Sequence, residues 1–580
     1  MAKQFIVVEM YKEKCIVLWI ILLFPVVFIG QDNGFRPPLD LGMNLSGTFG
    51  ELRSNHFHSG IDIRTNRSIG YPVYAIADGW VSRLRVGPTG FGRALYLTHP
   101  TGHTSVYAHL NRFNDDITRF VRQKQYANES FSVNFYLSRN QIPVKRGDII
   151  GYSGNSGSSA APHLHFEIRN AHNQHPTNVL KHGFEMKDNS CPLIQRLRFY
   201  PVGAGSAINQ KPYEQSVYVF DRGTDIKLNT SRVRISGKIA LGVQAIDQSY
   251  GSTKKNGPYR VSMYADSVKF WEFIADHFSF YETRYMNAMI DYGSYKRNGH
   301  KYYQSYLRPG NQLSMIAVKD NGLVEFAPGQ KRTIRIEVAD LAGNVSSVEF
   351  RLEGAALSDS TIAQPRLNGK LFHYDKDNYF EKEGIRLTIP AGALYDTLDF
   401  RYNKEEMPGD AYSKVHHVHN EFTPLHDYVA ISIKVDRLLS NGDKSKLMLM
   451  RKDHKGRRRP AGGSWNNGWV SAKIRDFGKY YVVADTIKPE ITPNNFYPGK
   501  TVNHGESIRF TVKDDLSGIK YYRGEINGKW VLFQYDPKKN RLYYELDERV
   551  EQGENNLLLT VSDKKGNIKV YRASFVTAGD

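Results

Sequence analysis

The sequence predicts a mainly β protein, in which an antiparallel β domain is followed by three β-sandwich-like modules. Short segments between residues 40 and 200 alternate apolar and polar side chains with a period of two, which is typical of strands with one buried face. The pattern V-x-D-x-x-G-N occurs twice beyond residue 200, each time before another alternating segment. The 580 residues amount to roughly four times the commonest domain size, so several domains are expected.

The first 30 residues are predicted to form a signal peptide. Lys12 and Lys14 precede an apolar stretch at residues 15–30, which as a helix would span about 24 Å, less than the roughly 30 Å of a bilayer core. A short apolar stretch behind basic residues is typical of exported proteins. An uncleaved anchor is the alternative. No later segment is apolar over a comparable length, so we expect no membrane span in the mature chain.

The composition predicts a folded protein with a basic surface. Lys and Arg number 78 against 59 for Asp and Glu, a formal net charge of +19. Such an excess favours anionic surroundings, so anionic polymers are expected partners. No run of basic residues interleaved with aromatic residues is present, and we therefore expect no nucleic-acid binding.

Residues 31–200 are predicted to form the first domain. Its predicted strands cover residues 72–79, 80–86, 93–99, 104–110 and 163–169. One helix is expected at residues 114–127, where Asn114 is placed as an N-cap and Ile117, Phe120 and Val121 share one face. We interpret this helix as an insertion between strands.

Three modules are predicted behind this domain. The two copies of V-x-D-x-x-G-N, at residues 338–344 and 561–567, place Gly-Asn at the positive-φ positions of a tight hairpin, and they predict Ig-like β modules at residues 201–355 and 488–580. Between them, residues 356–487 form a third strand-rich module. Its sequence Ile-Pro-Ala-Gly-Ala-Leu at residues 389–394 resembles the opening of ZU5-type β domains.

Four histidines and one aspartate in the first domain form a candidate catalytic site. His58 and Asp62 share a short Gly-containing turn, His109 ends a strand, and His163 and His165 face one side of another strand because they are two residues apart. Zinc in hydrolases commonly takes three ligands from His and Asp or Glu and keeps a fourth position for water. The remaining imidazoles can act as acid, base or oxyanion donor. Spacing alone does not say which histidines are ligands.

The order of motifs in residues 40–190 resembles the M23 family of zinc endopeptidases, of the lysostaphin and LytM type. The resemblance implies a mostly antiparallel β fold, one Zn²⁺ per chain and cleavage of peptide stems in the cell wall. It further implies His58, Asp62 and His165 as zinc ligands, with His109 and His163 as catalytic imidazoles. The motifs that carry it are His58-Ser-Gly-Ile-Asp62, residues 71–79, Gly90-Phe-Gly92, Tyr107-Ala-His-Leu110, residues 144–151, Gly154-Asn-Ser-Gly157 and His163-Leu-His165-Phe-Glu167.

Two further features lie outside this pattern. Residues 111–141 form a longer stretch than a minimal M23 member carries, and we interpret it as a wall or lid of the groove or as a regulator of access. A second histidine cluster, His416, His417, His419 and His426, has no carboxylate at a metal-like spacing. We interpret it as a solvated strand face and assign it no metal.

The expected function is that of an exported zinc-dependent endopeptidase in the periplasm, the cell envelope or outside the cell. It would hydrolyse peptide crosslinks of bacterial peptidoglycan, and a D,D-endopeptidase is favoured because a long envelope protein with Ig-like modules suits a Gram-negative wall. The alternative is a catalytically inactive peptidoglycan-binding scaffold or hydrolase activator. A third reading is an adhesin-like surface protein that acts through its Ig-like modules.

Overall fold

A computed structural model of the chain describes residues 34–186, 188–221, 226–228, 233–248, 255–358, 369–437 and 443–578. The predicted signal peptide lies outside the described residues. The structure is 48% strand and 7% helix, which confirms the predicted mainly β fold. Within the described ranges, no helix is both long and apolar enough to cross a bilayer.

The N-terminal domain (residues 34–186) is built on an antiparallel sheet with the strand order β1-β2-β11-β6-β5-β4-β8. A smaller sheet, β3-β10-β7, packs beside it. The strands of the first sheet are β1 (Leu45–Gly47), β2 (Ile61–Arg64), β11 (His163–Asn170), β6 (His103–Ala108), β5 (Ala94–Thr98), β4 (Gly79–Val86) and β8 (Val133–Tyr136). Those of the second are β3 (Pro72–Tyr74), β10 (Ile149–Tyr152) and β7 (Arg112–Phe113).

The predicted helix is present as α1 (Asp115–Ala127), and the Asn114 side chain accepts a hydrogen bond from the Ile117 amide as its N-cap. Ile117 and Val121 are buried and Phe120 packs at the edge of the same core. Burial of this face attaches α1 to the domain and leaves its opposite face free for another contact.

The first β module (residues 193–354) contains a large twisted sheet with the order β16-β15-β13-β17-β24-β23-β18-β19-β21. Its strands are β13 (Leu193–Pro201), β15 (Gln215–Asp221), β16 (Ile226–Leu228), β17 (Arg234–Ile246), β18 (Arg260–Ala265), β19 (Val268–Ile274), β21 (Ile316–Val318), β23 (Lys331–Ala339) and β24 (Val345–Gly354). Two short helices, α2 (Met286–Met289) and α3 (Tyr292–Asn298), follow β19. Because β13 pairs with β17, the first β module begins at residue 193 and not at residue 201, where the sequence placed its start.

The middle module (residues 370–484) has two sheets, with the orders β26-β27-β31-β35-β34 and β29-β30-β36-β32-β33. Their strands are β26 (Asn378–Lys382), β27 (Ile385–Ile389), β29 (Tyr402–Glu405), β30 (Val415–Val418), β31 (Pro424–Lys434), β32 (Leu447–Lys452), β33 (Arg458–Gly462), β34 (Ser464–Asn466), β35 (Trp469–Asp476) and β36 (Gly478–Ala484). The apolar side chains of both sheets share one core.

The last module (residues 490–577) also has two sheets, β37-β39-β43-β42 and β38-β45-β44-β40-β41. Their strands are β37 (Glu490–Pro493), β38 (Thr501–Val502), β39 (Ser507–Lys513), β40 (Ile519–Ile526), β41 (Lys529–Val531), β42 (Gln534–Asp536), β43 (Arg541–Glu545), β44 (Gly553–Asp563) and β45 (Ile568–Thr577).

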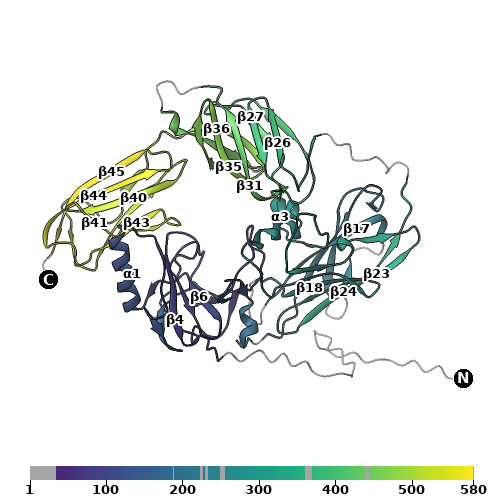
Figure 1. Ribbon diagram of the computed structural model, residues 1–580, viewed down its shortest axis with the longest axis horizontal. Helices are drawn as coiled ribbons and strands as arrows, with labels where there is room; N and C mark the ends of the chain where they lie inside the picture. Colours follow the sequence, from purple (N-terminus) through teal and green to yellow (C-terminus); the bar gives the residue numbers. More distant parts are fainter. Residues whose placement is uncertain are drawn as a thin grey trace.

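The four units form a closed ring (Figure 1). The last module returns to the N-terminal domain, where Tyr126 on α1 donates a hydrogen bond to Asp547 at 2.5 Å. The insertion that carries α1 is therefore covered by the last module.

The two repeated turns form the hairpins β23–β24 and β44–β45, but only their glycines adopt a positive φ, +94° at Gly343 and +75° at Gly566. Asn344 and Asn567 keep negative φ angles, which corrects the expectation that Gly-Asn supplies two left-handed positions. The asparagines act through their side chains: Asn344 donates to Asp340, and Asn567 donates to Asp563.

Candidate metal centre

The candidate site lies where β2 and β11 pair side by side. In this antiparallel register Asp62 stands directly opposite His165, so their side chains leave the same face of the sheet. Gly60 permits the close approach, because a Cβ atom at that position would lie 2.2 Å from the carbonyl oxygen of Phe166. His58 comes from the turn just before β2.

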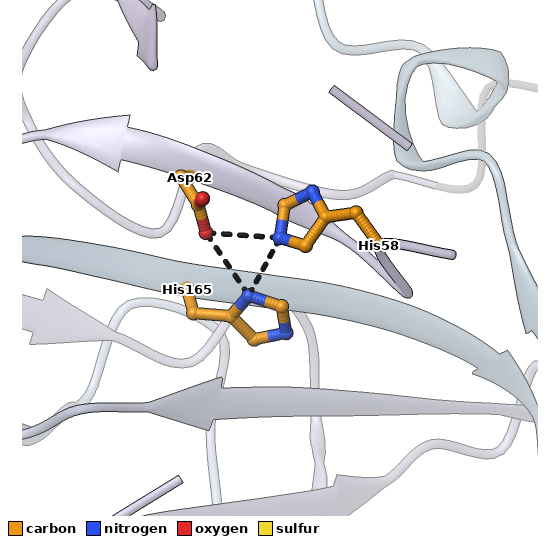
Figure 2. A group of neighbouring side chains, drawn as sticks. All are labelled: His58, Asp62 and His165. Atoms are coloured by element: carbon orange, nitrogen blue, oxygen red, sulfur yellow. Dashed lines mark hydrogen bonds and ion pairs between the residues drawn. The ribbon is translucent and has the colours of Figure 1, made fainter. Parts of the chain in front are cut away.

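Three donor atoms meet at this point (Figure 2). His58 Nε2 lies 3.0 Å from Asp62 Oδ1 and 3.1 Å from His165 Nδ1. His165 Nδ1 lies 3.0 Å from Asp62 Oδ1, which closes a nearly equilateral triangle. All three side chains are buried.

The hydrogen bonds on the far side of each imidazole fix its tautomer. His58 Nδ1 lies 2.8 Å from the carbonyl oxygen of Thr48, which only accepts, so Nδ1 carries the proton. His165 Nε2 lies 2.8 Å from Glu167 Oε1 and donates to that carboxylate. In the neutral imidazoles, His58 Nε2 and His165 Nδ1 therefore turn lone pairs toward the carboxylate oxygen of Asp62.

When both imidazoles are neutral, three electron-pair donors face one another and repel unless a cation lies between them. Ligands about 2 Å from one ion in a tetrahedral arrangement are separated by about 3.3 Å, close to the triangle observed. Two imidazoles and one carboxylate are a donor set that zinc accepts, with a fourth position left for water. The residues present therefore fit a zinc ion.

Charged neighbours hold Asp62 and His165 in place. Asp62 Oδ2 accepts from Arg53 at 2.9 Å. Although burial favours the neutral acid, the imidazoles of His58, His163 and His165 hold the pKa of Asp62 well below its usual range. Burial likewise opposes a proton on His165, yet the carboxylates of Asp62 and Glu167 outweigh it and raise the pKa of His165 to about 9.

Glu167 is the fully buried carboxylate behind His165. Arg169 Nε donates to its Oε2 at 2.5 Å, and Ser59 Oγ donates to its Oε1 at 2.5 Å. Burial would favour its neutral form, but Arg169 and His165 lower the pKa of Glu167 to about 2. A carboxylate that accepts from the outer nitrogen of a metal-ligating histidine fixes the ring and raises its basicity.

The other two predicted histidines lie beside the triangle. His163 Nε2 is 3.3 Å from Asp62 Oδ1, and its Nδ1 donates to the carbonyl oxygen of Ala161 at 2.8 Å. The ring of His109 lies 4.9 Å from that of His163, and its Nδ1 donates to the carbonyl oxygen of Ser156 at 2.9 Å. The structure thus brings all five predicted site residues together.

His109 has a strained backbone. Its φ is +60°, which is uncommon for a residue with a Cβ and costs about 1–3 kcal/mol. The position is fixed from both sides, since the His109 amide donates to Phe91 and its carbonyl oxygen accepts from the Ser156 amide. Burial and the nearby imidazoles of His165 and His163 lower the pKa of His109 to about 3, so the ring is neutral at pH 7.

The five residues line an open groove. The segment at residues 158–162 forms one side, and Phe280 and Thr283 of the first β module contribute to the lining. None of the described lining residues comes from residues 111–141. The expectation that this insertion forms a wall or lid of the groove is therefore wrong, since its helix contacts the last module instead.

The first β module also anchors the turn that carries His58. Phe49, Leu52 and Phe57 are packed into the core of the first β module rather than into that of the N-terminal domain. The Phe57 amide donates to Thr283 Oγ1 at 2.8 Å. The turn of a candidate metal ligand in one domain is thus held by the side chains of the next.

The sequence analysis did not identify the residues that orient the candidate ligands. Glu167 and Arg169 continue the alternation of His163 and His165 along β11, so the period-two pattern itself contained a signal for them. No such signal exists for the carbonyls of Thr48, Ser156 and Ala161, because any residue offers a carbonyl oxygen. Arg53 lies outside the motifs, so its side chain carried no signal either.

The second histidine cluster is not a solvated strand face. His416 on β30 is 2% exposed and its Nδ1 lies 2.9 Å from the Tyr402 hydroxyl. His419 Nε2 lies 2.9 Å from the Thr423 hydroxyl, and the ring of His426 stacks on Tyr285 with centroids 4.3 Å apart. The expectation failed because neighbouring side chains contact these rings, among them Tyr402 of the adjacent strand β29 and Tyr285 of the first β module.

Two segments match known protein families. Residues 56–134 and 126–179 match the peptidase family M23, and residues 369–485 match the Zu5-like domain. The chain therefore carries an M23 peptidase domain and a Zu5-like domain, as the motifs predicted.

Individual relatives share the N-terminal part of the chain. It is 30% identical over 190 residues to the DD-carboxypeptidase/endopeptidase Mpg of Neisseria meningitidis serogroup B, covering 30% of this chain and 38% of that protein. It is 34% identical over 111 residues to lysostaphin of Staphylococcus simulans, covering 19% and 17%. A zinc-containing peptidase structure from Vibrio cholerae matches at 25% identity with a TM-score of 0.20, covering 27% of this chain and 41% of that one. The chain thus spans well under half of these relatives.

Proposed function

We propose that this chain, whose residues 56–179 form an M23 peptidase domain, is a zinc-dependent endopeptidase that hydrolyses peptide crosslinks of bacterial peptidoglycan. The observation that carries the proposal is the meeting of His58 Nε2, Asp62 Oδ1 and His165 Nδ1 within 3.1 Å of one another, with an acceptor on the far side of each imidazole. Two imidazole nitrogens and one carboxylate oxygen that converge in this way are a typical zinc donor set.

His58, Asp62 and His165 would hold one zinc ion per chain. Bound zinc supplies a water of lowered pKa and polarises the scissile carbonyl. His109 and His163 each donate from Nδ1 to a backbone carbonyl oxygen. This leaves their Nε2 atoms to accept a proton from the attacking water, to return it to the leaving amine or to orient the substrate.

The substrate we favour is the D,D-crosslink of a peptidoglycan peptide stem. The Neisseria relative is named a DD-carboxypeptidase/endopeptidase, which supports this class of bond. The groove is open rather than enclosed, so it suits a crosslinked polymer better than a small molecule. The basic charge of the chain suits anionic envelope polymers, and export by residues 1–30 would bring the enzyme to the envelope.

The test is a paired measurement of zinc content and turnover on the full chain. His58→Ala and Asp62→Ala are expected to lose zinc and activity together. His163→Ala and His109→Ala are expected to keep zinc and lose at least about a hundredfold in the release of crosslinked muropeptides from sacculi. His172→Ala, an exposed histidine of the same domain, is the matched control and should change neither quantity.

The same measurement distinguishes the alternative. A wild-type chain that binds zinc and sacculi but releases no muropeptide would be a scaffold or hydrolase activator. A wild-type chain that binds no zinc would contradict the proposal at its first step.

A further inference from the structure

A second group of carboxylates lies at the joint between the N-terminal domain and the first β module. Asp188 follows the N-terminal domain, Asp247 follows β17 and Asp340 follows β23. One carboxylate oxygen of each lies within 4.8 Å of the others, and the three residues are 6%, 3% and 5% exposed. Three segments far apart in the sequence thus bury their acidic groups at one point.

Nothing cationic in the described chain compensates Asp247 and Asp340. Neither forms an ion pair with a lysine or arginine of the described residues, and Asp247 Oδ1 has no hydrogen-bond partner among them. Burial, together with the charges of Asp340 and Asp188, raises the pKa of Asp247 to about 7. Buried carboxylates that are neither paired nor bound to a metal are strongly unfavourable.

The joint is held in this arrangement by the repeated turn. Asp340 accepts from the Asn344 amide at 2.9 Å and from Asn344 Nδ2 at 2.7 Å. Asn344 Nδ2 also donates to the carbonyl oxygen of Asp188 at 3.0 Å. These donors are neutral, so they position the carboxylates without neutralising them.

The last module contains the same arrangement with one difference. Asp563 accepts from Asn567, and Asn567 Nδ2 donates to the carbonyl oxygen of Asp485, the counterpart of Asp188. This joint too gathers acidic groups, from Asp485, Asp514 and Asp515.

A lysine distinguishes this second joint. The Lys565 ammonium is attracted by the carboxylates of Asp485 and Asp563. In the first β module the position of Lys565 in the repeat is taken by Ala342. The second joint therefore has a cation beside its carboxylates, whereas Asp247 and Asp340 of the first joint have none among the described residues.

We propose that the first joint binds a calcium ion through the carboxylates of Asp188, Asp247 and Asp340. The donors are all oxygen atoms, which hard divalent cations prefer, whereas zinc favours nitrogen and sulfur. Calcium accepts irregular sets of six to eight oxygens and waters, while magnesium demands a near-ideal octahedron. The ion would neutralise the cluster and fix the exit of the N-terminal domain against the first β module.

The test is a calorimetric titration of CaCl₂ into the full chain after chelator treatment and reloading with zinc. We expect about one calcium per chain, with a dissociation constant near 10⁻⁴–10⁻³ M, and a melting temperature that rises with calcium. Asp247→Asn should abolish both effects, and Asp515→Asn, on an exposed residue of the second joint, should leave them intact. Absence of calcium binding by the wild type at about 10 mM would overturn the proposal, as would tighter binding of magnesium or of a second zinc.

A second variant keeps the test decisive if Asp247→Asn fails to fold. Ala342→Lys places an ammonium where the second joint has Lys565. It is expected to raise the melting temperature in the absence of calcium and to weaken calcium binding at least about tenfold, as mass action requires when a fixed charge competes for the site. Ala342→Gln, a neutral side chain at this exposed position, should keep the wild-type calcium response. Equal calcium responses in the two variants would contradict the proposed site.

Discussion

The ring of Phe57 packs against the ring of Phe273, with centroids 6.2 Å apart, and so joins the residue before His58 to the core of the first β module. Phe278 contacts the same ring at 5.6 Å. The candidate metal centre of the N-terminal domain is therefore supported by the module that follows it.

Removal of this anchor should weaken the metal centre without touching a ligand. Phe57→Ala deletes a ring that is 1% exposed and should cost about 3–5 kcal/mol of local packing. The turn that carries His58 would loosen, so we expect zinc affinity of the full chain to fall at least about tenfold in a chelator competition. Tyr497→Ala removes an exposed ring of the last module and serves as control. Unchanged zinc affinity in Phe57→Ala would show that the turn that carries His58 keeps its conformation without this ring.

Glu167 should control zinc affinity although it lies outside the donor triangle. Glu167→Gln keeps the shape of the side chain and removes the charge that accepts from His165 Nε2. Loss of such a partner costs about 10–100-fold in metal affinity, and we expect a fall in this range. The variant also leaves the Arg169 charge buried without its carboxylate, which should lower the unfolding free energy by about 3 kcal/mol. Full zinc affinity in a destabilised variant would assign Glu167 to the fold alone.

The middle module should lose stability in mild acid because it buries neutral histidines. Burial lowers the pKa of His416 to about 4 and that of His419 to about 4. An unfolded chain takes up a proton near pH 6.5, so stability is complete above that pH and falls as the pH drops from 6.5 toward 4. For His416 the loss can reach about 3 kcal/mol.

Scanning calorimetry of the full chain between pH 7.5 and pH 4.5 measures this loss. His416→Gln keeps a polar partner for Tyr402 and removes the titrating ring, so its melting temperature should depend less on pH. His172→Gln, on an exposed histidine, should follow the wild type. Identical pH profiles for His416→Gln and the wild type would exclude His416 as the source.

The parts of the molecule that the sequence predicts best are those set by local periodicity. The alternation on β11 placed His163 and His165 on one face, and Asn114 marked the start of α1. Contacts between units are invisible to such patterns. The burial of Phe57 in a neighbouring core and the pairing of β30 with β36 both depend on residues 60 or more positions away.

The sequence motif predicts both repeated turns correctly but not the role of their asparagines. The pattern V-x-D-x-x-G-N predicts two hairpins, and both are present. Asparagine is common at left-handed turn positions, so a positive φ was the natural expectation. Instead Asn344 and Asn567 bond the aspartate of the turn and the segment that enters the module. Each asparagine thus links its hairpin to the segment that enters the module, a contact that the sequence of the hairpin alone does not predict.

Closure of the ring should depend on Asp547. This buried carboxylate of the last module accepts from Arg122 and Tyr126 of α1, and from the neighbouring Tyr544. Asp547→Asn removes its charge and should weaken the docking of the last module by about 1–2 kcal/mol, since its ion pair with Arg122, whose side chain is 37% exposed, is lost. We expect faster hydrogen exchange in residues 115–127, with Glu554→Gln on an exposed residue as control.

The docked module also contacts the edge of the groove. Lys538 Nζ donates to the carbonyl oxygen of Ser159 at 3.0 Å, four residues before His163. Loss of docking should therefore loosen the side of the groove that positions the His163 imidazole. We expect the kcat of Asp547→Asn to fall about tenfold at unchanged zinc content. Lys538→Ala should reproduce the loss of kcat without the faster exchange in α1. If Asp547→Asn opens the interface and leaves kcat at the wild-type value, the closure of the four units has a structural role only and does not affect the groove.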